Sequence, residues 1–427
     1  MDEQLRNIAS DVQAAYGLEE YYLKEQDCCL FRERNALHES IYIYSMTFYP
    51  QRYAENEQED ENPEGAAIVE INFHSKQLRR MVFVQGKSFA NQTGAYPDND
   101  RESVIDWVEN RTGLAWGRQF QLAESSDGTY KFHATVDNIP VHPGGIIKVR
   151  FADQKLVSFS IYGVFPQEEQ VIWEPFALLP EDVEKISFSQ LKLVDFPVHS
   201  QKKWVPIYGL EETFITNDKR IIPMEINDSS GAFIKMDKVI EWKEIAVPEG
   251  FRRQELKLDD KAPMEEAREN VADPDTKPIT KAQKEACVKT VTRFLQAVYP
   301  NDSGKWRLTK LQRDHGYLAA DLKETEMKRQ RILADKVRLF ILPETMEPLN
   351  YIDRKSFLDT FTEYKNNETV TVPKEAALEK IRDDITLEPI YVYDHERKSF
   401  ILCGKLDCDY GVDAVSGERV WLDDFQD

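Results

Sequence analysis

The chain repeats one order of features, once in its middle and once near its C-terminus. The first copy runs from Pro180 through Pro206-Ile-Tyr208 to residues 226–231, and the second from Pro373 through Pro389-Ile-Tyr391 to residues 412–417. Each copy contains a helix-like start, a strand and a Ser-Gly turn. A repeated supersecondary unit has to bury its apolar face against a neighbour. The repeat therefore indicates a packing unit more than a catalytic one.

The same alternation of helix and strands is predicted elsewhere along the chain. Leu5, Ile8 and Val12 recur at helical spacing, and strand-like stretches follow at 40–49, 66–73 and 77–85. The strand pair 71–81 matches 149–159, with apolar residues at equivalent positions on both sides of a polar turn. This pattern predicts half-buried hairpins.

The part after residue 280 is read in the same way. Thr280-Lys-Ala-Gln283 is a capping box that predicts the start of a helix. Residues 317–342 predict two strands around a charged turn, although helix propensity also fits residues 323–335.

These patterns predict an α+β fold of tandem units, in which one helix packs on a curled antiparallel β-meander. We expect five units, with the second and third together resembling the fourth and fifth. The expected division is 1–97 for the first unit, 98–250 for two units, 251–280 for a charged, proline-containing linker, and 281–427 for two further units. Such a linker would let the two halves move independently.

Composition limits the partners. With 76 acidic and 55 basic residues, the formal net charge is −21, which disfavours nucleic acid and anionic membranes. The basic run Lys328-Arg329-Gln330-Arg331 is interleaved with Glu324 and Glu326, and we expect a solvated turn there. We see no export signal at the N-terminus and no apolar run of the ~20 residues that a membrane helix needs. Five cysteines fit reduced, buried thiols, so a cytoplasmic location is expected.

The sharpest acidic cluster contains Asp407, Asp409 and Asp413. Carboxylates at alternate positions near a glycine resemble the start of a calcium loop, so these three are weak candidates for metal ligands. Strand alternation instead places them on the solvent face, with Cys408, Tyr410 and Val412 facing the core. We favour this second interpretation, and expect no metal, no cofactor and no catalytic residue.

Two further features leave alternatives open. Asp314-His315-Gly316 fits a turn, but His315 with nearby acids is also a candidate for a hydrolase site in a cleft between the two halves. The tyrosine-rich strands 42–49 and 391–393 are candidates for sheet edges that bind a peptide, whereas β-propensity predicts ordinary half-buried strands.

The segment from Tyr410 to Val420, Tyr-Gly-Val-Asp-Ala-Val-Ser-Gly-Glu-Arg-Val, resembles the closing hairpin of a PepSY-type domain. The duplicated arrangement is similar to the YcdB/YcdC repeat proteins of Bacillus-type bacteria. The resemblance implies tandem α+β units and a link with the control of peptidases. The host range of the family also suggests a structural protein of a differentiated cell, such as a spore layer.

The sequence as a whole predicts a non-enzymatic binding or regulatory protein with a protein or peptide partner. The hydrolase and the structural protein remain the alternatives. Neither the identity of the partner nor the oligomeric state follows from the sequence.

Overall fold

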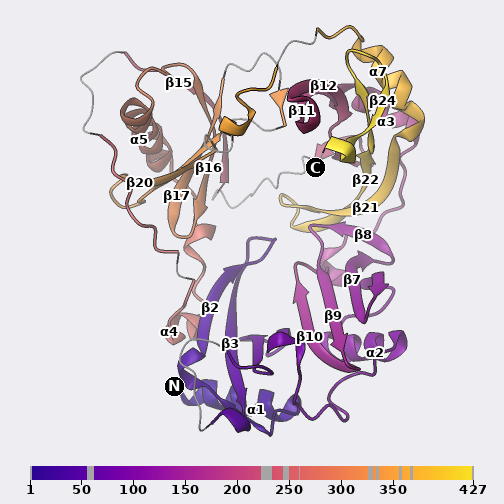
Figure 1. Cartoon of the computed structure of the whole chain (residues 1–427), viewed down its shortest axis with the longest axis vertical. Coiled ribbons are helices and arrows are strands. Elements are labelled where there is room, and N and C mark those ends of the chain that lie inside the picture. The colour runs from indigo at the N-terminus through magenta and orange to yellow at the C-terminus, as the bar shows by residue number, and fades with distance from the viewer. Residues whose placement is uncertain are drawn as a thin grey trace.

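The computed structural model describes residues 2–54, 62–222, 233–243, 250–258, 260–325, 330–332, 336–354, 358–365 and 369–425. Over these residues the fold is mixed, with α-helices packed on β-sheets (Figure 1). The helices are α1 (Glu3–Ala15), α2 (Arg101–Thr112), α3 (Pro180–Gln190), α4 (Met264–Glu269), α5 (Lys281–Val298) and α7 (Lys374–Ile381). The strand pairings between the described residues are antiparallel apart from two, β8 with β21 and β11 with β18.

The N-terminal part of the chain builds one continuous antiparallel sheet that α1 and α2 share. Its strands are β1 (Tyr21–Leu23), β2 (Cys29–Arg34), β3 (Ser40–Pro50), β4 (Ala67–Asn72), β5 (Leu78–Phe83), β6 (Phe120–Ser126), β7 (Thr129–Val136), β8 (Ile139–His142), β9 (Ile146–Ala152) and β10 (Lys155–Tyr162). Both helices contribute buried residues to a single hydrophobic cluster with these strands, including Val12 from α1 and Val108 from α2. The helices therefore close the same core.

The two predicted hairpins are confirmed as β4–β5 and β9–β10. They lie beside each other because β5 pairs with β10, with Met81 opposite Phe159. On one side of this pair, the sheet continues from β5 through β4 to β3, and β2 pairs with β3. On the other side, it continues from β10 through β9 to β7, and β6 pairs with β7. Two helix-plus-meander segments thus meet through their equivalent last strands.

The two copies of the sequence repeat also pack against each other. After α3 come β11 (Leu191–Val198), β12 (Lys203–Leu210), β13 (Thr213–Thr216) and β14 (Ile221–Ile222); after α7 come β21 (Thr386–Asp394), β22 (Ser399–Asp407), β23 (Tyr410–Asp413) and β24 (Arg419–Trp421). Strand β13 pairs with β14 of its own copy and with β22 of the other, and β23 pairs with β24 of its own copy and with β12 of the other. The two copies therefore exchange their third strands, and α3 and α7 share one core between them.

The expected match of the two Pro-Ile-Tyr motifs is wrong. Pro206 lies in β12, the second strand after its helix, whereas Pro389 lies in β21, the first strand after its helix. Chain order therefore makes β11 the counterpart of β21. The Ser-Gly turn expected at residues 226–231 lies outside the described residues.

The helix predicted from the Thr280 capping box is confirmed as α5, and Thr280 and Gln283 make both capping hydrogen bonds. The two strands predicted within residues 317–342 are confirmed as Tyr317–Glu324 and Lys336–Ile341. The sheet under α5 contains β15 (Phe233–Ile240), β16 (Trp306–Asp314), β17 (Tyr317–Glu324), β19 (Lys336–Ile341) and β20 (Pro348–Asp353). Because β15 pairs with β16, the domain boundary expected at residue 250 divides this sheet.

The expected linker is packed against both of its neighbours. Ala267 in α4 is fully buried in the N-terminal core, and Phe31 of β2 forms a β-bridge with Lys261. At the other end, the buried carboxylate of Asp275 accepts hydrogen bonds from the backbone N–H groups of His315 and Gly316, at 2.6 and 2.8 Å. These contacts contradict a free hinge between two halves.

The α5 sheet is also connected to the two repeat copies, α3 with β11–β14 and α7 with β21–β24, which together we call the exchanged-strand lobe. Strand β18 (Gln330–Arg331) adds in parallel to β11, and the Arg331 guanidinium lies 4.4 Å from the centre of the Trp204 ring. Strand β8 joins the N-terminal sheet to β21. The N-terminal sheet, the α5 sheet and the exchanged-strand lobe are thus each connected to the other two. In Figure 1, the N-terminal sheet lies at the bottom and the other two lobes lie above it.

Strand exchange predicts that damage in one copy reaches the other. Leu406 of β22 is fully buried in the shared core and lies opposite Thr213 of β13. We expect Leu406→Ala to lower the free energy of unfolding by about 2–5 kcal/mol in urea titrations. Hydrogen exchange should accelerate in β13 as well as in β22.

The matched control is Leu179→Ala, because Leu179 is 60% exposed. This change should alter stability by no more than about 0.5 kcal/mol. Faster exchange that stays within residues 386–413 would contradict the exchanged arrangement.

Candidate ligand-binding face

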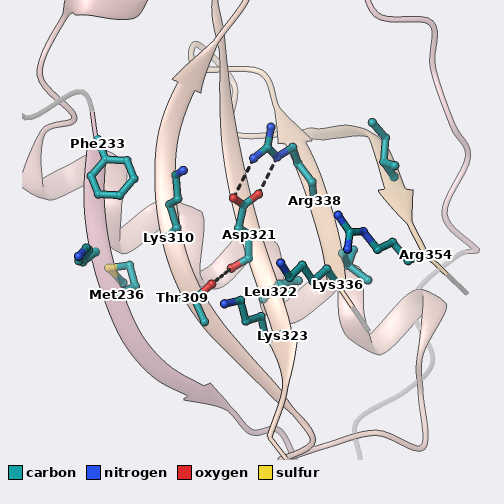
Figure 2. A pocket seen from close by; sticks show the side chains of 13 residues that line it. Phe233, Met236, Thr309, Lys310, Asp321, Leu322, Lys323, Lys336, Arg338 and Arg354 are labelled. Atoms are coloured by element: carbon teal, nitrogen blue, oxygen red, sulfur yellow. Dashed lines mark hydrogen bonds and ion pairs between the residues drawn. The ribbon is translucent and has the colours of Figure 1, made fainter. Parts of the chain in front are cut away.

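The sheet under α5 is hollowed on the face opposite the helix (Figure 2). The hollow has a volume of about 670 Å³. Its lining includes six cationic side chains and one carboxylate: Lys235, Lys310, Lys323, Lys336, Arg338, Arg354 and Asp321. We call these seven residues the basic face. The chain has a net charge of −21, so this hollow has the opposite charge balance to the chain as a whole.

Strand alternation builds the basic face. In β17, Ala320 and Leu322 are buried under α5, whereas Asp321 and Lys323 point the other way. In β19, Leu339 belongs to the same core while Arg338 lines the hollow. One set of strands therefore supplies a packed core on one face and a charged surface on the other.

The strand register places like charges directly opposite each other. Lys235 faces Lys310 between β15 and β16, and Lys323 faces Lys336 between β17 and β19. Like charges at directly opposite positions destabilise a sheet. Within the described residues, Lys235, Lys323 and Arg354 form no ion pair. An anion bound beside these three side chains would be attracted by their positive charge.

Asp321 holds the centre of the basic face. The Arg338 guanidinium donates from Nε to Asp321 Oδ1 at 2.7 Å and from Nη2 to Oδ2 at 2.9 Å. Its Nη1 lies 3.3 Å from Asp314 Oδ2. The hydrogen bonds to Asp321 raise the pKa of Arg338 above its usual range. Arg338 is therefore fixed and neutralised by protein carboxylates.

Apolar side chains also line the hollow. Phe233 and Met236 lie at the β15 side, and Ile352 on β20 is 61% exposed. The Lys310 ammonium lies 4.6 Å from the centre of the Phe233 ring, a cation–π contact that orients it. The hollow thus offers charge and apolar surface together, as ligand sites commonly do.

The predicted metal candidates are not gathered into a site. No group of three or more potential ligands forms among the described residues. Asp407 pairs with Lys405 at 2.8 Å, and Asp413 accepts hydrogen bonds from the backbone N–H groups of Val415 and Ser416. Asp409 is exposed, while Cys408 and Val412 are buried as alternation predicts. Asp407 and Asp413 therefore have structural partners.

His315 lies in the turn between β16 and β17, where the linker meets the sheet. Its Nδ1 is 2.7 Å from Asp314 Oδ1, and its Nε2 is 3.8 Å from Asp260 Oδ1. Burial lowers the pKa of His315, but the hydrogen bond with Asp314 and the charges of Asp314, Asp260 and Asp275 outweigh it, so the pKa is raised. These contacts make His315 part of a joint between two lobes.

The buried cysteines lack the character of nucleophiles. Cys287, Cys403 and Cys408 are buried as expected, and burial raises the pKa of Cys287 to about 11 and of Cys403 to about 12. Both thiols stay protonated at neutral pH, and the thiolate is the reactive form.

The structure excludes one of the two alternatives for the tyrosine-rich strands and contradicts the expected solvated turn at Arg331. The tyrosine-rich strand β3 is paired on both edges, by β1 and β2 on one side and by β4 on the other, and β21 is paired by β22 and β8. Neither strand is a free edge for a peptide. Arg331 does not lie in a solvated turn, because its backbone pairs with β11; Lys328 and Arg329 lie outside the described residues.

Sequence reasoning missed the basic face because its cations are separated along the chain. One cation lies on β15, which precedes α5 in the sequence, and four lie on β16, β17 and β19, which follow it. Arg354 lies just after β20. The available signal was alternation within single strands, as in Asp321-Leu-Lys323 and Lys336-Val-Arg338. Only the register makes these positions neighbours.

Comparison with known proteins adds little to the geometry. Neither a protein-family model nor a curated protein matches the chain. Among solved structures, it is similar to the Bacillus megaterium YpeB C-terminal domain, with 9% sequence identity and a TM-score of 0.24 over 83% of this chain and 97% of that one. So low a score carries no argument about fold or activity, and the PepSY-type resemblance stays a prediction. No described helix is both long and apolar enough to span a bilayer.

The joint at His315 predicts a pH-dependent stability. Because the folded-state pKa of His315 is raised, its contribution is complete below the ordinary value of 6.5 and is lost as pH rises through the folded value. Urea titrations at a series of pH values should show stability falling across this window. His315→Gln should flatten that slope and leave the rest of the pH profile unchanged. An identical slope in the variant would contradict the assignment.

Proposed function

We propose that this chain is a non-enzymatic binding protein that holds an acidic segment of a protein or peptide on its basic face. The observation that carries the proposal is the gathering of six cationic side chains around one hollow, three of which, Lys235, Lys323 and Arg354, form no ion pair among the described residues. An anionic group placed beside these three side chains would be attracted by their charge.

A polypeptide ligand agrees with the rest of the surface better than a polyphosphate does. A chain with a net charge of −21 repels the closely spaced charges of nucleic acid over a long range. A peptide carries fewer charges and also supplies apolar side chains for Phe233, Met236 and Ile352. The hollow, at about 670 Å³, lies in the usual size range of ligand sites.

A binding role also suits the surroundings of the charged groups. The Arg338 guanidinium already donates hydrogen bonds to Asp321 and Asp314. It therefore holds neighbouring strands in position and is not available to activate a substrate. The lysines are held by sheet register, on strands packed against α5. The packed sheet fixes the backbone at these positions, so the backbone does not have to be ordered when a ligand arrives, which favours affinity.

The test is a charge reversal at the basic face. We expect Lys323→Glu to weaken binding of a fluorescein-labelled peptide of alternating glutamate and threonine by about tenfold or more, a loss of about 1.4 kcal/mol. Fluorescence anisotropy would measure it. Wild-type affinity should also fall as salt rises from about 0.05 M to about 0.5 M, because salt screens exposed charges.

Lys289→Glu is the matched control. Lys289 is exposed on α5, across the sheet from the basic face, and the substitution makes the same change in net charge. It should leave affinity within about twofold. Equal losses in the two variants, or tighter binding of single-stranded DNA than of the acidic peptide, would overturn the proposal.

A further inference from the structure

We infer that a small hollow at the junction of the N-terminal sheet and the exchanged-strand lobe binds the arginine side chain of a peptide. The hollow has a volume of about 220 Å³ and lies at the end of β7. In Figure 1 this is the region where β8 lies between β7 and β21. The hollow shares no residue with the basic face, so the inference goes beyond the proposed function and does not depend on it.

The walls of this hollow are fixed by both lobes. One wall is the end of β7, and the other is the segment 166–173. Gln119 Nε2 donates a hydrogen bond to the carbonyl of Pro166 at 3.1 Å. The backbone N–H of Ile172 donates to the carbonyl of Phe400 in β22 at 2.9 Å. The segment is therefore held near both ends, and its backbone does not have to be ordered when a ligand arrives.

The observation that carries the inference is the side chain of Tyr391 in β21. Tyr391 is only 2% exposed, yet its hydroxyl forms no hydrogen bond among the residues that the structure describes. The oxygen is not itself enclosed, so a ligand can reach it. The Tyr391 ring lies edge-on to the ring of Trp173, which lines the hollow, with the ring centres 6.3 Å apart. A donor group placed beside Trp173 would give this hydroxyl a partner.

The charge around the two rings is negative. The lining of the hollow contains one cation and three carboxylates: Arg118, Asp137, Glu168 and Glu169. Burial raises the pKa of Tyr391, and the charges of Asp137 and Glu174 raise it further, which places both carboxylates near its hydroxyl. This balance repels an anion and attracts a cation. The net charge of −21 on the chain adds to the attraction at longer range.

Two of these carboxylates are open to a ligand. Glu169 is exposed and Glu174 is half-buried, and neither forms an ion pair among the described residues. Arg118 lies 3.6 Å from Asp137 and 3.4 Å from Glu168. All three of those side chains are more than half exposed, and exposed pairs of this kind are weak. An incoming cation therefore meets two unpaired carboxylates and does not have to displace Arg118.

The aromatic surface and the size of the hollow favour a guanidinium group. Trp173 is 49% exposed, and a planar guanidinium can stack on an aromatic ring while its N–H groups donate to carboxylates. A lysine ammonium is a compact point charge without this planar fork. The volume of about 220 Å³ is below the ~300–1,000 Å³ of pockets that enclose a whole ligand, so one side chain suits it.

The test observes Trp173 directly, by ¹⁹F NMR of the full chain labelled with 5-fluorotryptophan. Trp173→Phe identifies its resonance among those of the seven tryptophans. N-acetylarginine methylamide should shift this resonance in a saturable way. The citrulline analogue has nearly the same shape but no charge, and it should bind about tenfold more weakly. The lysine analogue should also bind more weakly than the arginine probe.

Substitutions locate the binding groups. Glu169→Gln and Glu174→Gln should each weaken binding of the arginine probe about threefold. The matched control is Glu344→Gln, which makes the same change in charge in an exposed turn of the α5 sheet and should leave affinity within about twofold. Tyr391→Phe should weaken binding and leave the midpoint of urea unfolding unchanged, because the lost hydroxyl bonds no described group.

Several outcomes would overturn the inference. These are a Trp173 resonance that the arginine probe does not move, equal binding of the citrulline analogue, tighter binding of the lysine analogue, and an equal loss in Glu344→Gln. A lower urea midpoint for Tyr391→Phe would show that the hydroxyl has a structural role and would also overturn it. None of these measurements involves the basic face, so the proposed function stands or fails separately.

Discussion

The pairing of strand edges is the constraint on which the rest of this structure depends. An unpaired edge leaves a row of backbone N–H and C=O groups available to other chains. Here β5 meets β10, β12 takes β23, and β22 takes β13. The edge of β2 takes the segment around Lys261. Each unit thus completes its sheet with a strand from elsewhere in the chain, which makes the lobes interdependent.

The sheet under α5 is built by the same rules but is used differently. One face is covered by α5, and at one end of the other face Tyr317 and Phe340 are buried beneath Leu256. The remaining end carries the basic face. Its neighbours β18 and the linker connect the sheet to both other lobes, so the charged surface is held in a fixed setting.

Local structure was predictable because its causes are local. The Thr280 capping box, the matched hairpins at 71–81 and 149–159, and the core positions of Cys408 and Val412 all follow from patterns a few residues long. The boundary expected at residue 250 was wrong, and of the two alternatives left open at 42–49 and 391–393, ordinary paired strands are found and free edges are not. These features depend on partners far away in the sequence. The side chains of a strand carry little information about which other strand its backbone will pair with.

The sequence by itself determined which residues form helices and strands and which side of each strand is apolar, because periodicity and capping act within one element. It also determined the strongly acidic balance of the chain. Tertiary structure alone decided that two repeats exchange strands and that Lys235, Lys310, Lys323 and Lys336 share one surface. The physical reason is register: inter-strand hydrogen bonds, formed between residues distant in sequence, determine which charges become neighbours.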